Sequence, residues 1–154
     1  MSDAQPPTTQ PIAQPIAHQG TCVMIGTQGL LIEGPPGAGK SSLALALIDR
    51  GATLVGDDGV LIEARNGRVI ASPHPRIAGK LEIRNLGLVE MPAVGGVPLA
   101  LMVRLDTAAP RFVAAADSAV LAGCALPMIR LYPDTPVLAL RAEVALRQFG
   151  LPDF

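Results

Sequence analysis

Short apolar runs bounded by turn residues dominate the first two thirds of the chain. Runs at residues 20–25, 30–33, 52–55, 60–64, 68–72 and 97–105 predict strands. The turn at residues 26–29 joins the first two runs as a hairpin, and Arg65-Asn66-Gly67 predicts a second hairpin. Residues 107–125 are Ala-rich and weakly patterned, and residues 126–131 predict one more short strand.

Two segments show helical spacing instead. Residues 41–50 place apolar side chains three and four positions apart, and Gly51 follows as a natural stop. A final helix is predicted with Thr135 as its cap and Pro136 at its first position, running to about Phe149 and ending at Gly150. Because the connection through the first helix is short, we expect the strand after it to lie beside the strand before it.

Residues 1–17 differ from the rest of the chain in composition. They are rich in Pro, Gln and Thr and cannot bury enough apolar surface to order themselves. We therefore predict a flexible N-terminal lead over residues 1–17 and one domain over residues 18–154. The 154 residues are 49% hydrophobic but only 3% aromatic, which predicts an aliphatic core.

Charge and cysteine content limit the classes of partner. Twelve basic and thirteen acidic residues give a net charge of −1, and no basic stripe occurs, so nucleic acid is a poor candidate. Apolar stretches are all too short for a transmembrane helix, so no membrane partner is expected. Cys22 and Cys124 are far apart in apolar surroundings, which indicates reduced thiols in a cytoplasmic protein.

A phosphate-binding motif follows the predicted hairpin. The segment GPPGAGKS at residues 34–41 fits the pattern GxxxxGK[ST], with a strand before it and a helix after it. The glycines let backbone N–H groups curl around one anion, and the helix adds its positive dipole end. Lys40 supplies a charge for the β- and γ-phosphates, and the Ser41 hydroxyl can bind Mg²⁺. The predicted nucleotide-binding residues are Gly34, Pro35, Pro36, Gly37, Ala38, Gly39, Lys40, Ser41 and Ser42.

Asp57 and Asp58 follow the next predicted strand. Ligands of such sheets bind at the C-terminal ends of the strands, so both carboxylates are expected near the γ-phosphate. One would help to hold the metal, and the other would accept a proton from an attacking hydroxyl. The sequence DDG also suits a solvated turn, which is the alternative interpretation.

Charged and aliphatic residues alternate in a later segment. Leu81 and Ile83 alternate with Glu82 and Arg84, so a strand here buries the aliphatic pair and presents the charged pair on its other face. By itself this pattern is typical of an exposed ion pair on an edge strand.

Three segments resemble the catalytic domain of bacterial HPr kinase/phosphorylase, in the short form without that family's large N-terminal domain. They are TCVMIGTQGLLIEGPPGAGKSSLALALIDRGA, LVGDDGV and IAGKLEIRNLGLVEM, and together they span about residues 21–91. The third resembles the family's signature segment LEIRGLG and is much more specific than a P-loop alone. The resemblance implies an α/β fold, a P-loop-containing mixed β-sheet core flanked by helices, of the HPr kinase/PEP carboxykinase type.

The resemblance also implies an activity. It is that of an ATP- and Mg²⁺-dependent serine kinase acting on the phosphocarrier HPr, with a reverse phosphorylase reaction and a hexameric assembly. The P-loop would hold the phosphates of ATP, and Ser41 and Glu82 would bind Mg²⁺. Asp58, with Asp57 beside it, would deprotonate the target serine and would act as the acid in the reverse reaction.

Two further residues receive roles from the resemblance. Arg84 lies in the signature segment and would contact phosphate or brace the site. His18 resembles a family histidine that neighbours the catalytic aspartate, although one residue is inserted after it. Read without the family, His18 is an ordinary histidine of the N-terminal tail.

The chain departs from the family at two places. Asn85 stands where the signature has glycine, and the loop Pro133-Asp134-Thr135-Pro136 lacks an arginine that the family carries before its last helix. These departures bear on the phosphorylase activity, the oligomer contacts and regulation more than on the kinase chemistry. Two alternatives stay open: a small-metabolite kinase of the P-loop type, and a nucleotide-sensing module that has lost its chemistry, which the two departures favour.

Overall fold

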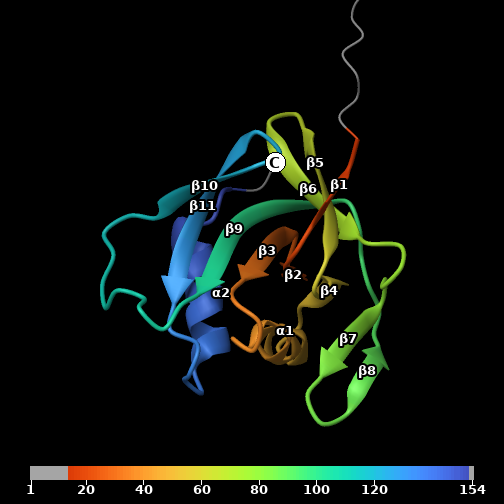
Figure 1. Ribbon diagram of the computed structural model, residues 1–154. Helices are drawn as coiled ribbons and strands as arrows, with labels where there is room; N and C mark the ends of the chain where they lie inside the picture. Colours follow the sequence, from red (N-terminus) through yellow and green to blue (C-terminus); the bar gives the residue numbers. More distant parts are fainter. Residues whose placement is uncertain (1–13, 153–154) are drawn as a thin grey trace, which may run out of the picture.

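The computed structural model describes residues 14–152 and shows a mixed α/β fold (Figure 1). The described strands form a nine-stranded sheet and a separate two-stranded hairpin. In chain order the elements are β1 (Ile16–His18), β2 (Thr21–Ile25), β3 (Gln28–Glu33), α1 (Lys40–Asp49), β4 (Thr53–Gly56), β5 (Val60–Arg65), β6 (Arg68–Pro73), β7 (Lys80–Ile83), β8 (Gly87–Glu90), β9 (Val97–Leu105), β10 (Asp117–Leu121), β11 (Cys124–Leu131) and α2 (Leu138–Phe149).

Strand direction brings four loops to one edge of the sheet. β9 is parallel to both β3 and β11, and β2 is antiparallel to both β3 and β4, so β3, β4, β9 and β11 all run the same way. Their C-terminal ends meet at one edge, where open α/β sheets bind ligands. The expectation that β4 lies directly beside β3 is wrong, because the short β2–β3 hairpin places β2 between them.

The large sheet divides and curls at the long strand β9. The beginning of β9 pairs with β6, and its later part pairs with β11. The curl brings β4 into contact with β6, two strands that are far apart in the sheet order (Figure 1). It encloses one aliphatic core that includes Leu31 and Met102. Alternate residues of the same strands, such as Ile32 and Leu101, point to the other face and pack against the helices.

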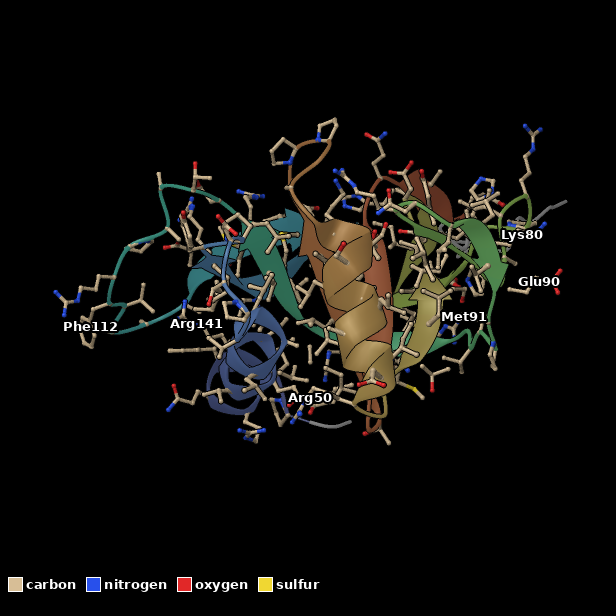
Figure 2. The ribbon with its side chains drawn as sticks, turned by 90° about the horizontal axis from the view of Figure 1, so that it is seen from below. Arg50, Lys80, Glu90, Met91, Phe112 and Arg141 are labelled. Carbon is tan, nitrogen blue, oxygen red and sulfur yellow. The ribbon has the colours of Figure 1, made fainter. Side chains whose placement is uncertain are left out.

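The two helices lie side by side on one face of the sheet (Figure 2). An ion pair of 2.9 Å between Arg50 and Glu143 joins them at the end of α1. Helix α1 agrees with the prediction to within one residue. Helix α2 ends before Gly150 as predicted but begins at Leu138, because Pro136 and Val137 form a turn first. Thr135 therefore caps that turn, accepting the Val137 N–H at 3.3 Å, and not the helix itself.

Three features of the structure go beyond the prediction. Ile16 and Ala17 belong to β1, paired with β5, so the domain begins before residue 18; residues 1–13 of the predicted lead lie outside the described residues. The strand predicted around residues 81–84 is β7, and it continues into a hairpin with β8. Strand β10 lies in the segment that showed no clear pattern. Within residues 14–152, neither helix has the length and apolar character needed to cross a membrane.

Candidate phosphate-binding and catalytic site

The loop between β3 and α1 has the backbone geometry of an anion site. Gly39 caps α1 with φ 103°, a left-handed conformation that glycine adopts at little cost, and its carbonyl accepts the Leu43 N–H at 2.9 Å. No side chain caps the helix. The first N–H groups of α1 therefore face the loop, where an anion would satisfy them and meet the positive end of the helix dipole.

Lys40 lies across this loop. Its ammonium group donates hydrogen bonds to the carbonyl oxygens of Gly34 at 2.9 Å and Pro35 at 3.2 Å. Lys40 also lines the clefts on both sides of the loop. Its charge therefore lies beside the loop, and its contact with a phosphate stays a prediction.

Asp57 is a buried residue whose carboxylate accepts three hydrogen bonds. Its Oδ1 accepts the Ser41 hydroxyl at 2.6 Å and the Thr21 hydroxyl at 3.0 Å, and its Oδ2 accepts the Glu82 N–H at 2.8 Å. Only 6% of the residue is exposed. Asp57 therefore joins α1, β2 and β7 at the point where the phosphate loop begins its helix.

Asp58 has the opposite environment. It is exposed, has φ 60°, and lines both clefts. The register between β2 and β4 shifts between Cys22 and Val23, and bulges of this kind re-aim side chains next to active sites. Gly56 permits the turn that follows, since a Cβ there would lie 2.7 Å from the carbonyl oxygen of Gly59. The side chain of Asp58 is thus free to meet a reactant.

Two open clefts flank the phosphate loop. One, of about 1060 Å³, runs from the loop to the ends of β9 and β11 and is lined by Arg104, Asp106 and Asp134 among others. The other, of about 540 Å³, lies between α1 and the β7–β8 hairpin and is lined by Ser41, Glu82 and others. Lys40 and Asp58 line both clefts, so a reactant in either cleft would meet the same two groups.

The signature segment reaches the site through the β7–β8 hairpin. Glu82 and Arg84 are exposed and line the smaller cleft together with Ser41. Asn85 has φ 76°, a conformation in which asparagine is the usual substitute for glycine. The departure at Asn85 therefore preserves the turn, and it gives no support to the idea that the chemistry has been lost.

His18 has a partner other than Asp58. Its Nε2 lies 2.6 Å from Glu33 Oε2, and Arg104 donates to Glu33 Oε1 at 3.2 Å. The hydrogen bond from His18 lowers the pKa of Glu33 against the opposing effect of burial, with a further contribution from Arg104. His18 is therefore part of strand β1 and is held beside Glu33, which lines the larger cleft, while His18 itself lines a separate hollow next to β10 and β11.

The donors at the smaller cleft suit magnesium and a nucleotide triphosphate. Ser41, Asp58 and Glu82 offer hydroxyl and carboxylate oxygens, which are the ligands that Mg²⁺ prefers. Within residues 14–152, no group of three His, Cys, Asp or Glu side chains is arranged to hold a metal by itself. Magnesium bound together with phosphates needs only one or two protein ligands, so the residues present fit that form.

Sequence reasoning missed three residues of this region. Thr21 is fully buried against Asp57, and Glu33 and Arg104 face each other at the ends of β3 and β9. Thr21 left one signal, as a hydroxyl residue at the start of an otherwise apolar strand. The pairing of Glu33 with Arg104 depends on strand order, which the local pattern does not contain.

The sequence matches a known family over most of its length. A family model described as the HPr Serine kinase C-terminal domain matches residues 10–103. The chain belongs to this family. The match contains the phosphate loop, both aspartates and the signature segment, so the residues around the smaller cleft lie within the matched region, while the far end of the larger cleft lies beyond it.

Individual relatives agree with this assignment. The chain is 40% identical over 85 residues to the HPr kinase/phosphorylase of Clostridium tetani (strain Massachusetts / E88), a match covering 55% of this chain and 28% of that protein. It is 41% identical over 87 residues to the HPr kinase/phosphorylase of Treponema pallidum (strain Nichols), covering 55% and 27%. The chain thus matches only about a quarter of the length of these curated relatives.

A solved structure shares the fold. The HPr(Ser) kinase/phosphatase from Coxiella burnetii has a TM-score of 0.76 to this structure at 26% sequence identity. The match covers 86% of this chain and 88% of the solved chain. The curled mixed sheet is therefore an arrangement shared with a member of the HPr serine kinase family.

Proposed function

We propose that the protein is an ATP- and Mg²⁺-dependent serine kinase that phosphorylates HPr or a similar phosphocarrier. The observation that carries the proposal is the junction of Ser41, Asp57 and Glu82 beside the phosphate loop, in a chain of the HPr serine kinase family. Relatives and the solved neighbour are named as HPr kinases, which supports HPr as the acceptor.

Asp57 and Asp58 have different environments, which suit them to different roles. Asp57 is buried and accepts three hydrogen bonds, so it has little capacity to take a proton. Asp58 is exposed to both clefts. In the proposed transfer, Asp58 accepts the proton of the serine hydroxyl as the serine oxygen bonds to the γ-phosphorus and the bond to ADP breaks.

The other groups bind and orient the nucleotide. Backbone N–H groups of the phosphate loop and the ammonium of Lys40 would hold the β- and γ-phosphates. Ser41 and Glu82 would hold Mg²⁺, which when bound neutralises charge on the phosphates. Arg84, at the rim of the smaller cleft, would contact phosphate or brace the hairpin.

A protein acceptor suits the surface better than a small alcohol. Leu86 and Leu88 are 75% and 68% exposed on the β7–β8 hairpin, next to the cleft that Asn85 and Gly87 line. Exposed leucines beside a catalytic cleft favour contact with another protein. They provide a reason to prefer HPr over a small metabolite.

The larger cleft bears on the reverse, phosphorylase reaction. Where the resemblance expects an arginine, the larger cleft presents Pro133 and Asp134, and a carboxylate disfavours inorganic phosphate. We therefore propose that the kinase direction dominates.

The free thiols of Cys22 and Cys124 agree with the reducing cytoplasm. The hexamer implied by the resemblance stays a prediction.

A labelling assay tests the proposal. The purified chain is mixed with Mg²⁺, γ-labelled ATP and an HPr-like protein from the same cell, and label is expected on one serine. A phosphocarrier with that serine changed to alanine is the matched control and should stay unlabelled. Failure to label any such phosphocarrier, with label passing instead to a small alcohol, would replace the proposal by a metabolite kinase. ATP binding without transfer to either acceptor would point to a nucleotide-sensing module.

A further inference from the structure

Thr21 and Asp57 are the two buried residues with polar or charged side chains within residues 14–152. Thr21 is fully buried at the start of β2, on a strand that carries no group implicated in binding phosphate. Burying a hydroxyl is unfavourable unless it is hydrogen-bonded, so the Thr21 hydroxyl is expected to have hydrogen-bond partners. Those partners are the two neighbouring aspartates.

The Thr21 hydroxyl connects the aspartates in both directions. It donates to Asp57 Oδ1 at 3.0 Å, and it accepts the backbone N–H of Asp58 at 3.3 Å. A hydroxyl can do both at once because it has one proton and two lone pairs. The Thr21 oxygen thus links the carboxylate of Asp57 to the backbone of Asp58.

This link constrains a backbone that would otherwise be free to move. Asp58 has φ 60°, a left-handed conformation that costs about 1 kcal/mol or more for residues other than glycine. Ser41 and the Glu82 N–H anchor the carboxylate of Asp57 from the other side, and Thr21 adds a hydrogen-bonded link from this carboxylate to the backbone N–H of Asp58. Without the hydroxyl, the Asp58 N–H loses its acceptor and the turn can relax.

We propose that Thr21 is a positioning residue of the phosphotransfer reaction: it holds the backbone of Asp58 at the angle that aims the carboxylate at the acceptor hydroxyl. The proposal rests on the proposed function for its catalytic consequence. Thr21 is fully buried in the wall of the smaller cleft, and its hydroxyl is engaged by Asp57 and Asp58. We therefore expect its effect to reach the reaction through these two residues and not through contact with substrate or metal. Displacement of a reacting group by about 1 Å can lower a rate by on the order of 100-fold.

Two substitutions at this position separate positioning from stability. Thr21→Val keeps the shape of the side chain but removes the hydroxyl, and Thr21→Ser keeps the hydroxyl. We expect Thr21→Val to lower kcat for serine phosphorylation by about 10- to 100-fold while the Kd for ATP changes by less than about threefold. Thr21→Ser should restore most of kcat. Thr53→Val, on the half-buried start of β4, is the matched control and should leave both constants unchanged.

A second measurement does not depend on activity. The exchange rate of the Asp58 amide hydrogen, followed by NMR, should rise about tenfold or more in Thr21→Val and stay close to wild type in Thr21→Ser. An unchanged exchange rate, or an unchanged kcat, in Thr21→Val overturns the proposal. Equal losses of kcat in the valine and serine variants overturn it as well. If wild type labels no phosphocarrier, the proposed function fails separately, and amide exchange still decides whether Thr21 holds Asp58.

Discussion

Asp57 and Asp58 are adjacent in the chain but differ in nearly every physical respect. Asp57 is buried and accepts hydrogen bonds from Ser41, Thr21 and the Glu82 backbone. Asp58 turns the other way through its positive φ and faces both clefts. The first is therefore suited to hold the site together and the second to exchange a proton.

Removing the charge of Asp58 should separate binding from chemistry. Asp58→Asn keeps the size of the side chain and cannot accept a proton, so we expect kcat to fall by 100-fold or more. The Kd for ATP should change little, because the phosphate loop and Lys40 are untouched. Steady-state transfer to HPr and calorimetric titration with ATP measure the two quantities.

Lys40→Ala is the comparison variant for this prediction. Loss of its ammonium group should weaken ATP binding and transfer together, since in the proposed reaction it contacts the phosphates in both the ground state and the transition state. Full transfer activity in Asp58→Asn would assign the proton acceptor to another group, and the proposed division between the two aspartates would be wrong.

The elements of this domain differ in how much the sequence alone could predict. The phosphate loop is a local motif, so its strand, turn and helix were found almost to the residue. The β7–β8 hairpin is held by Leu81, which is fully buried in the helix-side core, while Leu86 and Leu88 stay exposed. Local alternation predicted β7, but no local signal says which leucine meets the core and which meets solvent.

The residues of the candidate site likewise differ in how far the local sequence could predict them. Lys40, Ser41, both aspartates and Glu82 belong to segments with recognisable patterns, and the structure brings them together. Thr21, Glu33 and Arg104 became visible only with strand order, because each meets its partner across neighbouring elements.

The exposed leucines of the β7–β8 hairpin should act on the acceptor and not on the nucleotide. Changing Leu86 and Leu88 together to serine removes apolar surface without touching the buried Leu81. We expect KM for HPr to rise by about 5- to 50-fold, with kcat at saturating HPr and the Kd for ATP nearly unchanged. Initial rates over a range of HPr concentrations measure this.

Val120→Ser is a suitable control for the hairpin variant, because Val120 is 71% exposed on β10, outside both clefts that flank the loop. It should leave KM for HPr unchanged. Equal effects of the control and the hairpin variant would remove the hairpin from the acceptor surface.

At the scale of the whole molecule, the candidate site lies where the C-terminal ends of β3, β4, β9 and β11 meet at one edge of the sheet. Strand β1 lies close to this edge. Strand β1 contributes His18, which reaches Glu33 at the end of β3, and Arg104 at the end of β9 meets the same carboxylate. These contacts join three strands at the edge that carries the larger cleft. They predict that stability depends on the charge of Glu33.

The pKa of Glu33 lies below its usual value of 4.5, chiefly through the hydrogen bond from His18. A carboxyl group whose pKa is lower in the folded state stabilises the fold at higher pH, and it loses this contribution as the pH falls through the folded-state pKa. We expect Glu33→Gln to lower the free energy of unfolding by on the order of 1 kcal/mol at pH 7. The difference from wild type should shrink as the pH falls below 4.5.

Thermal unfolding of both proteins between pH 7 and pH 3 measures this dependence. Glu63→Gln is the matched control, because Glu63 pairs only with its neighbour Arg65 on the same strand, and it should show a much smaller effect. A gap between wild type and Glu33→Gln that stays constant down to pH 3 would contradict the assignment.

Strand β2 is hydrogen-bonded on both sides, to β3 and to β4, with an irregular register beside Cys22. Successive side chains of a strand point to opposite faces, so sliding β2 by one position would put the thiol of Cys22 where the hydroxyl of Thr21 now lies. Such a slide would also turn the buried Val23 toward the opposite face, so substitutions on β4 that loosen this alignment should lower the stability of the fold together with the proposed phosphotransfer.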